Sequence, residues 1–160
     1  MFAIFILTYG KDFLELSEST ILSCVLIAAA VQFFAIPVFG LLSDSVGRRP
    51  VYLAGAVSLA LFAFPYFWLV DTGNPVSVCI ATVISMVIVA AMYGPQAAFF
   101  SELFGTDVRY TGASIGYQLA SPLAGGLAPM ISLWLLKWSG GQSWPVAVYL
   151  IGLSAVTLVS

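Results

Sequence analysis

The chain has 160 residues, of which 61% are hydrophobic and only 8% are charged, and its formal net charge is −2. Soluble domains carry about 25% charged residues, so this composition excludes a soluble globular domain and indicates an integral membrane protein. The sequence has no histidine and no basic patch, which argues against an enzyme with a histidine base or metal site and against a nucleic-acid-binding protein.

Apolar segments follow one another along the chain, with short polar loops between them. A helix needs about 20 residues to cross a bilayer, so residues 1–10 are expected to be the second half of a helix. Ser19 or Thr20 is a candidate N-cap after the polar loop 11–19, and Pro50 suits the first turn of a helix. The predicted spans of this single membrane domain (1–160) are 20–43, 50–70, 76–101, 110–136 and 145–160, besides the partial span 1–10.

A charged stretch separates the first two complete spans. Charge at the centre of a bilayer costs about 3 kcal/mol or more per residue, so this stretch is predicted to form a turn at a membrane surface. The helices on either side of it should then cross the bilayer in opposite directions. We call residues 40–55 the signature stretch, and its glycines and charged residues are Gly40, Asp44, Gly47, Arg48, Arg49 and Gly55.

The signature stretch resembles the signature loop of the major facilitator superfamily of secondary transporters. All six residues just named match the family pattern, whereas Ser45 stands where the family usually has a basic residue. Residues 93–105 and 108–121 are similar to the tenth and eleventh helices of the metabolite:proton symporter branch. The resemblance covers nearly the whole chain. It implies an all-α membrane fold, the C-terminal six-helix half (helices seven to twelve) of a twelve-helix bundle, with the first and last helices truncated.

Basic and aromatic residues predict how the chain is oriented. The loops 44–49 and 102–109 fall on one side and carry three arginines, while the loops on the other side carry two lysines. The tryptophans fall near the second side, as in an interfacial belt: Trp68, Trp134, Trp138 and Trp144. The resemblance implies that the arginine-rich side is cytoplasmic and that the membrane is a bacterial inner membrane.

Charged residues on the arginine-rich side are candidates for a gate. Asp44 can cap the start of a neighbouring helix or pair with an arginine, and surface ion pairs worth about 1 kcal/mol or less can open and close readily. The resemblance implies a network that holds the cytoplasmic side shut until the two halves rock apart. The alternative is that the arginines only fix the topology. The candidate gate residues are Gly40, Asp44, Gly47, Arg48, Arg49, Glu102 and Arg109.

Polar side chains at membrane depth are candidates for a substrate cavity. An amide or phenol that faced lipid would lose its hydrogen bonds, so such groups should face the bundle interior or a water-filled cavity. They can bind the hydroxyl and carboxylate groups of a metabolite, or alternatively hold helices together. The resemblance implies that helices seven, eight, ten and eleven line the cavity, which is where these residues fall. The candidates are Gln32, Tyr93, Gln96, Tyr117 and Gln118.

Two further features are read as packing. A small residue recurs at every fourth position of the fourth complete span, which lets another helix approach closely. These residues are Gly112, Gly116, Ala120, Ala124 and Ala128. Cys24 and Cys79 lie on different segments, without a ligand or base at metal-site spacing, and are read as packing residues.

No ionisable residue lies deep in any complete span, although a proton-coupled carrier normally needs one. We therefore expect the coupling carboxylate in an N-terminal half absent from this chain, with the proton as coupling ion and no cofactor, metal or catalytic group. The resemblance implies proton symport of a small carboxylate, shikimate-like or betaine-like metabolite by alternating access. The expected partners are the lipid bilayer, the metabolite and that other half. Two alternatives stay open: a uniporter or drug exporter of the same fold, and a truncated or scaffold fragment that does not transport.

Overall fold

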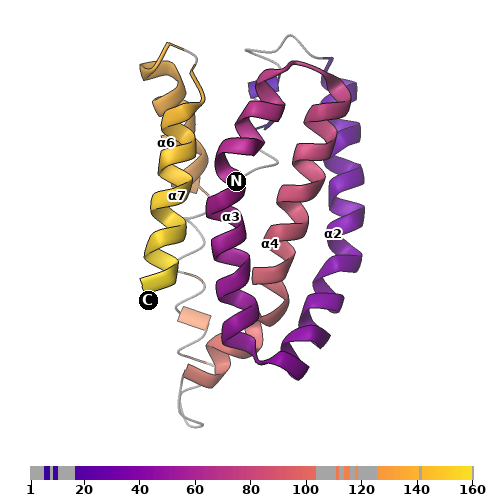
Figure 1. The fold of residues 1–160 in the computed structure, drawn as a ribbon, viewed down its shortest axis with the longest axis vertical. Helices are drawn as coiled ribbons and strands as arrows, with labels where there is room; N and C mark the ends of the chain where they lie inside the picture. The colour runs from indigo at the N-terminus through magenta and orange to yellow at the C-terminus, as the bar shows by residue number, and fades with distance from the viewer. Residues whose placement is uncertain are drawn as a thin grey trace.

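The structure is a computed structural model that describes residues 6–7, 9–10, 17–103, 111, 114–115, 118, 126–140 and 142–159. These residues form helices and no strand, which confirms the predicted all-α class (Figure 1). In chain order the helices are α2 (Glu18–Val46), α3 (Arg48–Asp71), α4 (Pro75–Leu103), α6 (Ala128–Trp138) and α7 (Trp144–Val159).

Three of these helices are long and apolar enough to cross a membrane. They are α2, α3 and the Pro75–Gln96 part of α4. Each contains an interior proline, at positions 37, 65 and 95. Such prolines are tolerated in membrane helices, because neighbouring groups and small adjustments of the helix satisfy the freed carbonyls.

The helices lie side by side, with α4 against both α2 and α3, and α7 against α3 (Figure 1). The chain reverses direction after α2 and again after α3, so α2 and α4 run parallel to each other. We call the end of the bundle that holds Gly47 the turn end. The opposite end, which holds the connections 71–75 and 139–143, is the cap end.

The main hydrophobic core lies in the cap half of the bundle. Tyr66, which is fully buried on α3, packs edge-on against Phe67 with 5.1 Å between ring centroids. Val70 of α3, Val78 of α4 and Leu150 of α7 belong to the same cluster. Towards the turn end α2 and α4 meet through glycines instead, as described below.

The N-terminus of α2 corrects one prediction. Ser17, and not Ser19 or Thr20, is the N-cap: its Oγ accepts a hydrogen bond from the backbone N–H of Thr20 at 3.3 Å. Serine hydroxyls satisfy the free N–H groups of a first helical turn in this way. The helix therefore begins two residues before the predicted span, because the polar residues Glu18 and Ser19 already adopt helical geometry.

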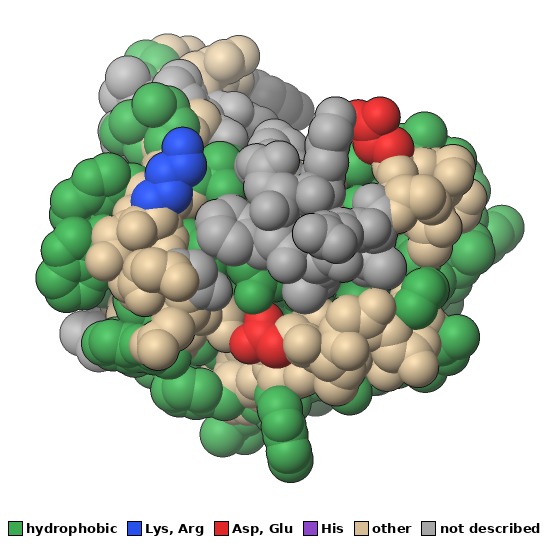
Figure 2. All heavy atoms as spheres, turned by 90° about the horizontal axis from the view of Figure 1, so that it is seen from above, with side chains coloured by type: hydrophobic (Ala, Val, Ile, Leu, Met, Phe, Trp, Pro, Cys, Tyr) green, Lys and Arg blue, Asp and Glu red, His purple; other side chains and the backbone are tan. Residues whose placement is uncertain are grey.

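Aromatic side chains ring the cap half. The four tryptophans are all exposed, and the rings of Trp134 and Trp138 stack with 6.5 Å between centroids. Figure 2 looks onto the cap end, where the acidic groups and the basic group in view lie apart among apolar and neutral polar atoms. Exposed tryptophan near one end of apolar helices is typical of a membrane–water interface.

Candidate functional site

The connection between α2 and α3 is shorter than predicted. The helix of α2 continues through Asp44 to Val46, and α3 already begins at Arg48, so Gly47 alone breaks the helical path. Gly47 has a φ of 106°, a region that side chains with a Cβ rarely adopt. Its N–H donates to the carbonyl of Ser43 at 3.0 Å and so closes the end of α2.

The single-residue connection brings Asp44 and Arg48 together. Nη2 of Arg48 lies 3.5 Å from Oδ1 of Asp44, and the two side chains are 30% and 62% exposed. Of the two roles predicted for Asp44, the structure shows the arginine pair and not the cap, since no side chain caps the start of α3. An exposed pair of this kind contributes about 0.5 kcal/mol or less, so it can break at little cost.

The other predicted gate residues are not gathered around this pair in the part of the chain that is described. Arg49 is exposed and follows the pair directly in the chain, and Gly40 lies in α2 about one turn before Asp44. The predicted loop 102–109 starts later than expected, because α4 continues through Glu102 to Leu103. Arg109 lies outside the described residues.

Glycines bring α2 and α4 into backbone contact near the turn end. A Cβ atom on Gly94 of α4 would lie 2.8 Å from the backbone nitrogen of Gly40 and 2.9 Å from the carbonyl oxygen of Ile36. No real Cβ fits at such distances, so the contact requires glycine at position 94. The Gly-Pro pair within the stretch 93–105 was a signal for a special position, but it did not indicate the partner helix.

The last glycine of the signature stretch, Gly55, packs α3 against α4. A Cβ atom on Gly55 would lie 2.6 Å from Cγ and 3.3 Å from the backbone nitrogen of Met92. Nearer the turn end, Tyr52 of α3 stacks on Phe99 of α4 with 5.5 Å between ring centroids. Both ends of the signature stretch therefore hold the same segment of α4.

Tyr93 lies on the side of α4 that these contacts leave open, and Gln96 lies between that side and the side that faces α3. With about 100° between successive helical residues, they sit about 100° and 160° around the axis from Gly94, which faces α2. Tyr93 is also turned away from Phe99, which faces α3, whereas Gln96, three residues before Phe99, borders the side that faces α3. Tyr93 is 49% exposed and Gln96 is half-buried. A phenol and an amide thus share one face of α4, at the depth set by the glycine contacts.

The remaining predicted cavity residues do not join this pair. Gln32 is half-buried and continues the buried stripe of α2 formed by Ile21, Cys24 and Ala28, so it lies on the face towards α4. Because position 40 lies beside position 94, Gln96 is about 15 Å nearer the turn end than Gln32. Gln118 is exposed, and Tyr117 lies outside the described residues.

The predicted small-residue stripe is largely untested. Gly112, Gly116, Ala120 and Ala124 lie outside the described residues. Ala128, the last position of the stripe, is 5% exposed at the start of α6. The packing role of the stripe stays a prediction.

Asp71 forms a polar cluster that sequence reasoning missed. Its Oδ1 accepts a hydrogen bond from the hydroxyl of Tyr9 at 2.6 Å, and its Oδ2 accepts one from the hydroxyl of Ser143 at 2.5 Å. The carboxylate thereby ties the end of α3 to residue 9 and to the segment before α7. An acid at a predicted loop boundary was the signal, but both donors lie more than 60 positions away.

A family model described as Major Facilitator Superfamily matches residues 1–159. The chain belongs to this superfamily. It is therefore part of a multi-pass membrane protein, in a family of transporters and not of enzymes. Within the described residues, no group of three or more His, Cys, Asp or Glu side chains could hold a metal ion.

Curated relatives of this superfamily chain are metabolite transporters by name. The "Shikimate transporter" of Escherichia coli (strain K12) is 32% identical over 96% of this chain and 36% of its own length. The "Citrate-proton symporter" of Klebsiella pneumoniae is 32% identical over 86% of this chain and 31% of its own length. The "Proline/betaine transporter" of E. coli (strain K12) is 33% identical over 85% of this chain and 27% of its own length. The chain thus spans about a third of these relatives, and no solved structure matches it.

Proposed function

We propose that the complete protein takes up a small organic metabolite together with protons across a bacterial inner membrane, by alternating access. This chain forms one helical half of it, in contact with lipid, with the substrate and with the N-terminal half. The substrate is a carboxylate, a shikimate-like compound or a betaine-like compound. The names of the relatives, which include a shikimate transporter and a citrate-proton symporter, support this substrate class.

The observation that carries the proposal is the face of α4 that bears Tyr93 and Gln96. Gln96 makes no hydrogen bond with a described residue and is only half-buried, so its amide can accept from a hydroxyl or donate to a carboxylate of a substrate. Tyr93 places a phenol less than one turn away on the same face. In a bilayer such groups are costly unless they meet water or a bound solute.

The Asp44–Arg48 pair supports the alternating-access part of the proposal. A transporter that rocks between two states needs contacts that differ little in free energy between the states. A half-exposed pair at 3.5 Å meets that condition. When the carrier changes between its inward-open and outward-open states, this pair would break at the cytoplasmic surface. Its charges would then pair with groups of the N-terminal half.

Proton coupling requires an ionisable group that the described helices α2, α3 and α4 do not place in the membrane. The acidic residues of α2, α3 and α4 are Glu18, Asp44, Asp71 and Glu102, and all stand within three residues of a helix end. The coupling carboxylate therefore belongs to the N-terminal half. This chain would supply the neutral hydrogen-bonding wall of the cavity.

Uptake of labelled shikimate, citrate, proline and glycine betaine into vesicles that contain the complete protein tests the proposal. We expect concentrative uptake of one of these classes that stops when a protonophore is added. Gln96→Ala should raise the apparent KM by about tenfold or more, because a hydrogen bond to a charged substrate is lost. The control Gln142→Ala, at the cap end, should leave the apparent KM and the maximal rate of uptake unchanged.

The same experiment separates the alternatives. Uptake that persists with the protonophore would favour a uniporter, and energy-dependent efflux would favour an exporter. The intact mass of the native gene product decides the remaining alternative. A mass near 17 kDa together with no uptake would identify a fragment that does not transport, and would overturn the proposal.

A further inference from the structure

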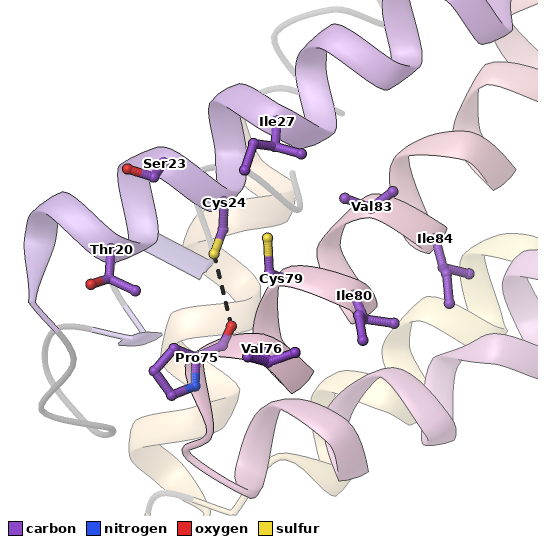
Figure 3. Close-up of a pocket in the computed structure, with 10 residues that line it drawn as sticks. All are labelled: Thr20, Ser23, Cys24, Ile27, Pro75, Val76, Cys79, Ile80, Val83 and Ile84. Carbon is purple, nitrogen blue, oxygen red and sulfur yellow. Dashed lines mark hydrogen bonds between the residues drawn. The ribbon is translucent and has the colours of Figure 1, made fainter.

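A groove of about 580 Å³ lies between the cap halves of α2 and α4 (Figure 3). Its walls are apolar side chains, among them Ile27 of α2 and Ile80 and Val83 of α4. The hydroxyls of Thr20 and Ser23 stand towards its cap end. The groove is separate from the face of Tyr93 and Gln96, which lies near the turn end.

Cys24 and Cys79 meet inside this groove, and no other cysteine occurs in the chain. Figure 3 shows their sulfur atoms next to each other in the space between α2 and α4. The Cys24 thiol donates to the carbonyl oxygen of Pro75 at 3.9 Å. Cys24 is 5% exposed, whereas Cys79 is half-buried.

The facing of the two thiols follows from how α2 and α4 are held. The helices are parallel, and the backbone contact between Gly40 and Gly94 fixes their register at the turn end. The offset between those two positions is 54 residues, and the offset between the two cysteines is 55. The same register therefore brings the cysteines opposite each other about four turns away.

We propose that Cys24 and Cys79 form an oxidisable dithiol that reacts with small apolar disulfides. The thiolate of Cys79, the more accessible sulfur, attacks one sulfur of the reagent disulfide and breaks its S–S bond, releasing one thiol. The thiolate of Cys24 then attacks the Cys79 sulfur in the mixed disulfide and releases the second thiol. The two cysteine protons end on the released thiols, and the two electrons lost by the cysteines reduce the reagent.

The lining of the groove selects the reagent. Apolar walls favour an uncharged aromatic disulfide and disfavour a charged one, which would have to shed its hydration. The product is a covalent link between α2 and α4 at the cap end. This link joins two side chains that are already neighbours, so it requires little movement of the helices. The Asp44–Arg48 pair, at the opposite end of the bundle, is not involved.

The complete protein in membranes, treated with dipyridyl disulfide and then digested, tests the proposal. We expect the peptide that contains Cys24 to be joined to the one that contains Cys79, with the loss of two hydrogen atoms and reversal by dithiothreitol. Oxidised glutathione, which is charged, should react at a rate at least about tenfold lower than that of dipyridyl disulfide. Equal rates for the two reagents would overturn the role of the groove.

Single variants separate the pair from other thiols of the complete protein. In Cys24→Ser the remaining Cys79 should keep a stable mixed disulfide with pyridinethiol, because no second thiol can displace it. In Cys79→Ser the buried Cys24 should react slowly and also fail to form a link. Persistent mixed disulfides on both cysteines of the wild-type protein, or no reaction at either, would overturn the proposal without reference to any variant.

Discussion

Gly47 is the residue on which the turn between α2 and α3 depends. Its φ of 106° allows α3 to begin one residue after α2 ends. We predict that Gly47→Ala destabilises the protein by about 1–2 kcal/mol, because a Cβ at positive φ meets the neighbouring carbonyl. Thermal unfolding in detergent measures this. Gly152→Ala, inside α7 where an added Cβ meets nothing within 4 Å, is the control and should not lower the midpoint.

The Asp44–Arg48 pair should matter for transport far more than for stability. We predict that Asp44→Asn and Arg48→Gln each change the free energy of unfolding by about 0.5 kcal/mol or less, since the pair is exposed and 3.5 Å long. Each should nevertheless reduce uptake strongly in the complete protein, with normal amounts in the membrane. Normal uptake by both variants would show that these charges only fix topology.

At the scale of elements, one backbone contact joins α2 and α4. We predict that Gly94→Ala destabilises the protein by about 1–3 kcal/mol, because the new Cβ would press on backbone atoms of α2 that cannot turn aside. The matched control lies across the same contact. A Cβ on Gly40 would lie 3.8 Å from the carbonyl oxygen of Gly94, an ordinary distance, so Gly40→Ala should be tolerated.

Equal effects of these two substitutions in thermal unfolding would contradict the geometry of the contact. Uptake adds a second readout. Since Gly94 sits between Tyr93 and Gln96, Gly94→Ala should also raise the apparent KM of the complete protein, whereas Gly40→Ala should not.

Sequence reasoning predicted the helices better than their contacts. Composition and segment length were enough to predict an all-α membrane chain, and the signature stretch was enough to identify the family. Helix ends were missed where local geometry decides them, as at Ser17 and Gly47, because polar residues next to a span can continue the helix. The pairing of Asp44 with Arg48 could be expected from their sequence spacing, since the two residues are one helical turn apart.

Contacts between distant segments were not predictable. Gly94 against Gly40, and Cys24 against Cys79, depend on the parallel register of α2 and α4, which no local pattern encodes. The predicted cavity residues are not all brought together, for the same reason. Tyr93 and Gln96 are neighbours on α4, while Gln32 lies on the side of α2 that packs against α4. The depth of a residue along its helix could be counted from the sequence. The direction of its side chain could be told only once the neighbouring helices were placed.

At the scale of the whole molecule, Asp71 joins segments that are far apart in the chain. We predict that Asp71→Asn destabilises the protein by about 1–3 kcal/mol, because an amide cannot accept both hydroxyl donors as a carboxylate does. Asp44→Asn, the same change at an acid that pairs with Arg48 one turn away in the chain, is the control. Thermal unfolding should separate the two variants, and equal midpoints would contradict a role of Asp71 in holding the cap end together.

We propose that the complete protein carries a metabolite and protons together, with this chain as one half of the carrier. The most direct test is to add the transported metabolite to proteoliposomes in a weakly buffered medium and to record the external pH. Cotransport predicts that the medium becomes alkaline as the metabolite enters, and that a protonophore abolishes the change. Entry of the metabolite without any change of external pH would contradict proton symport.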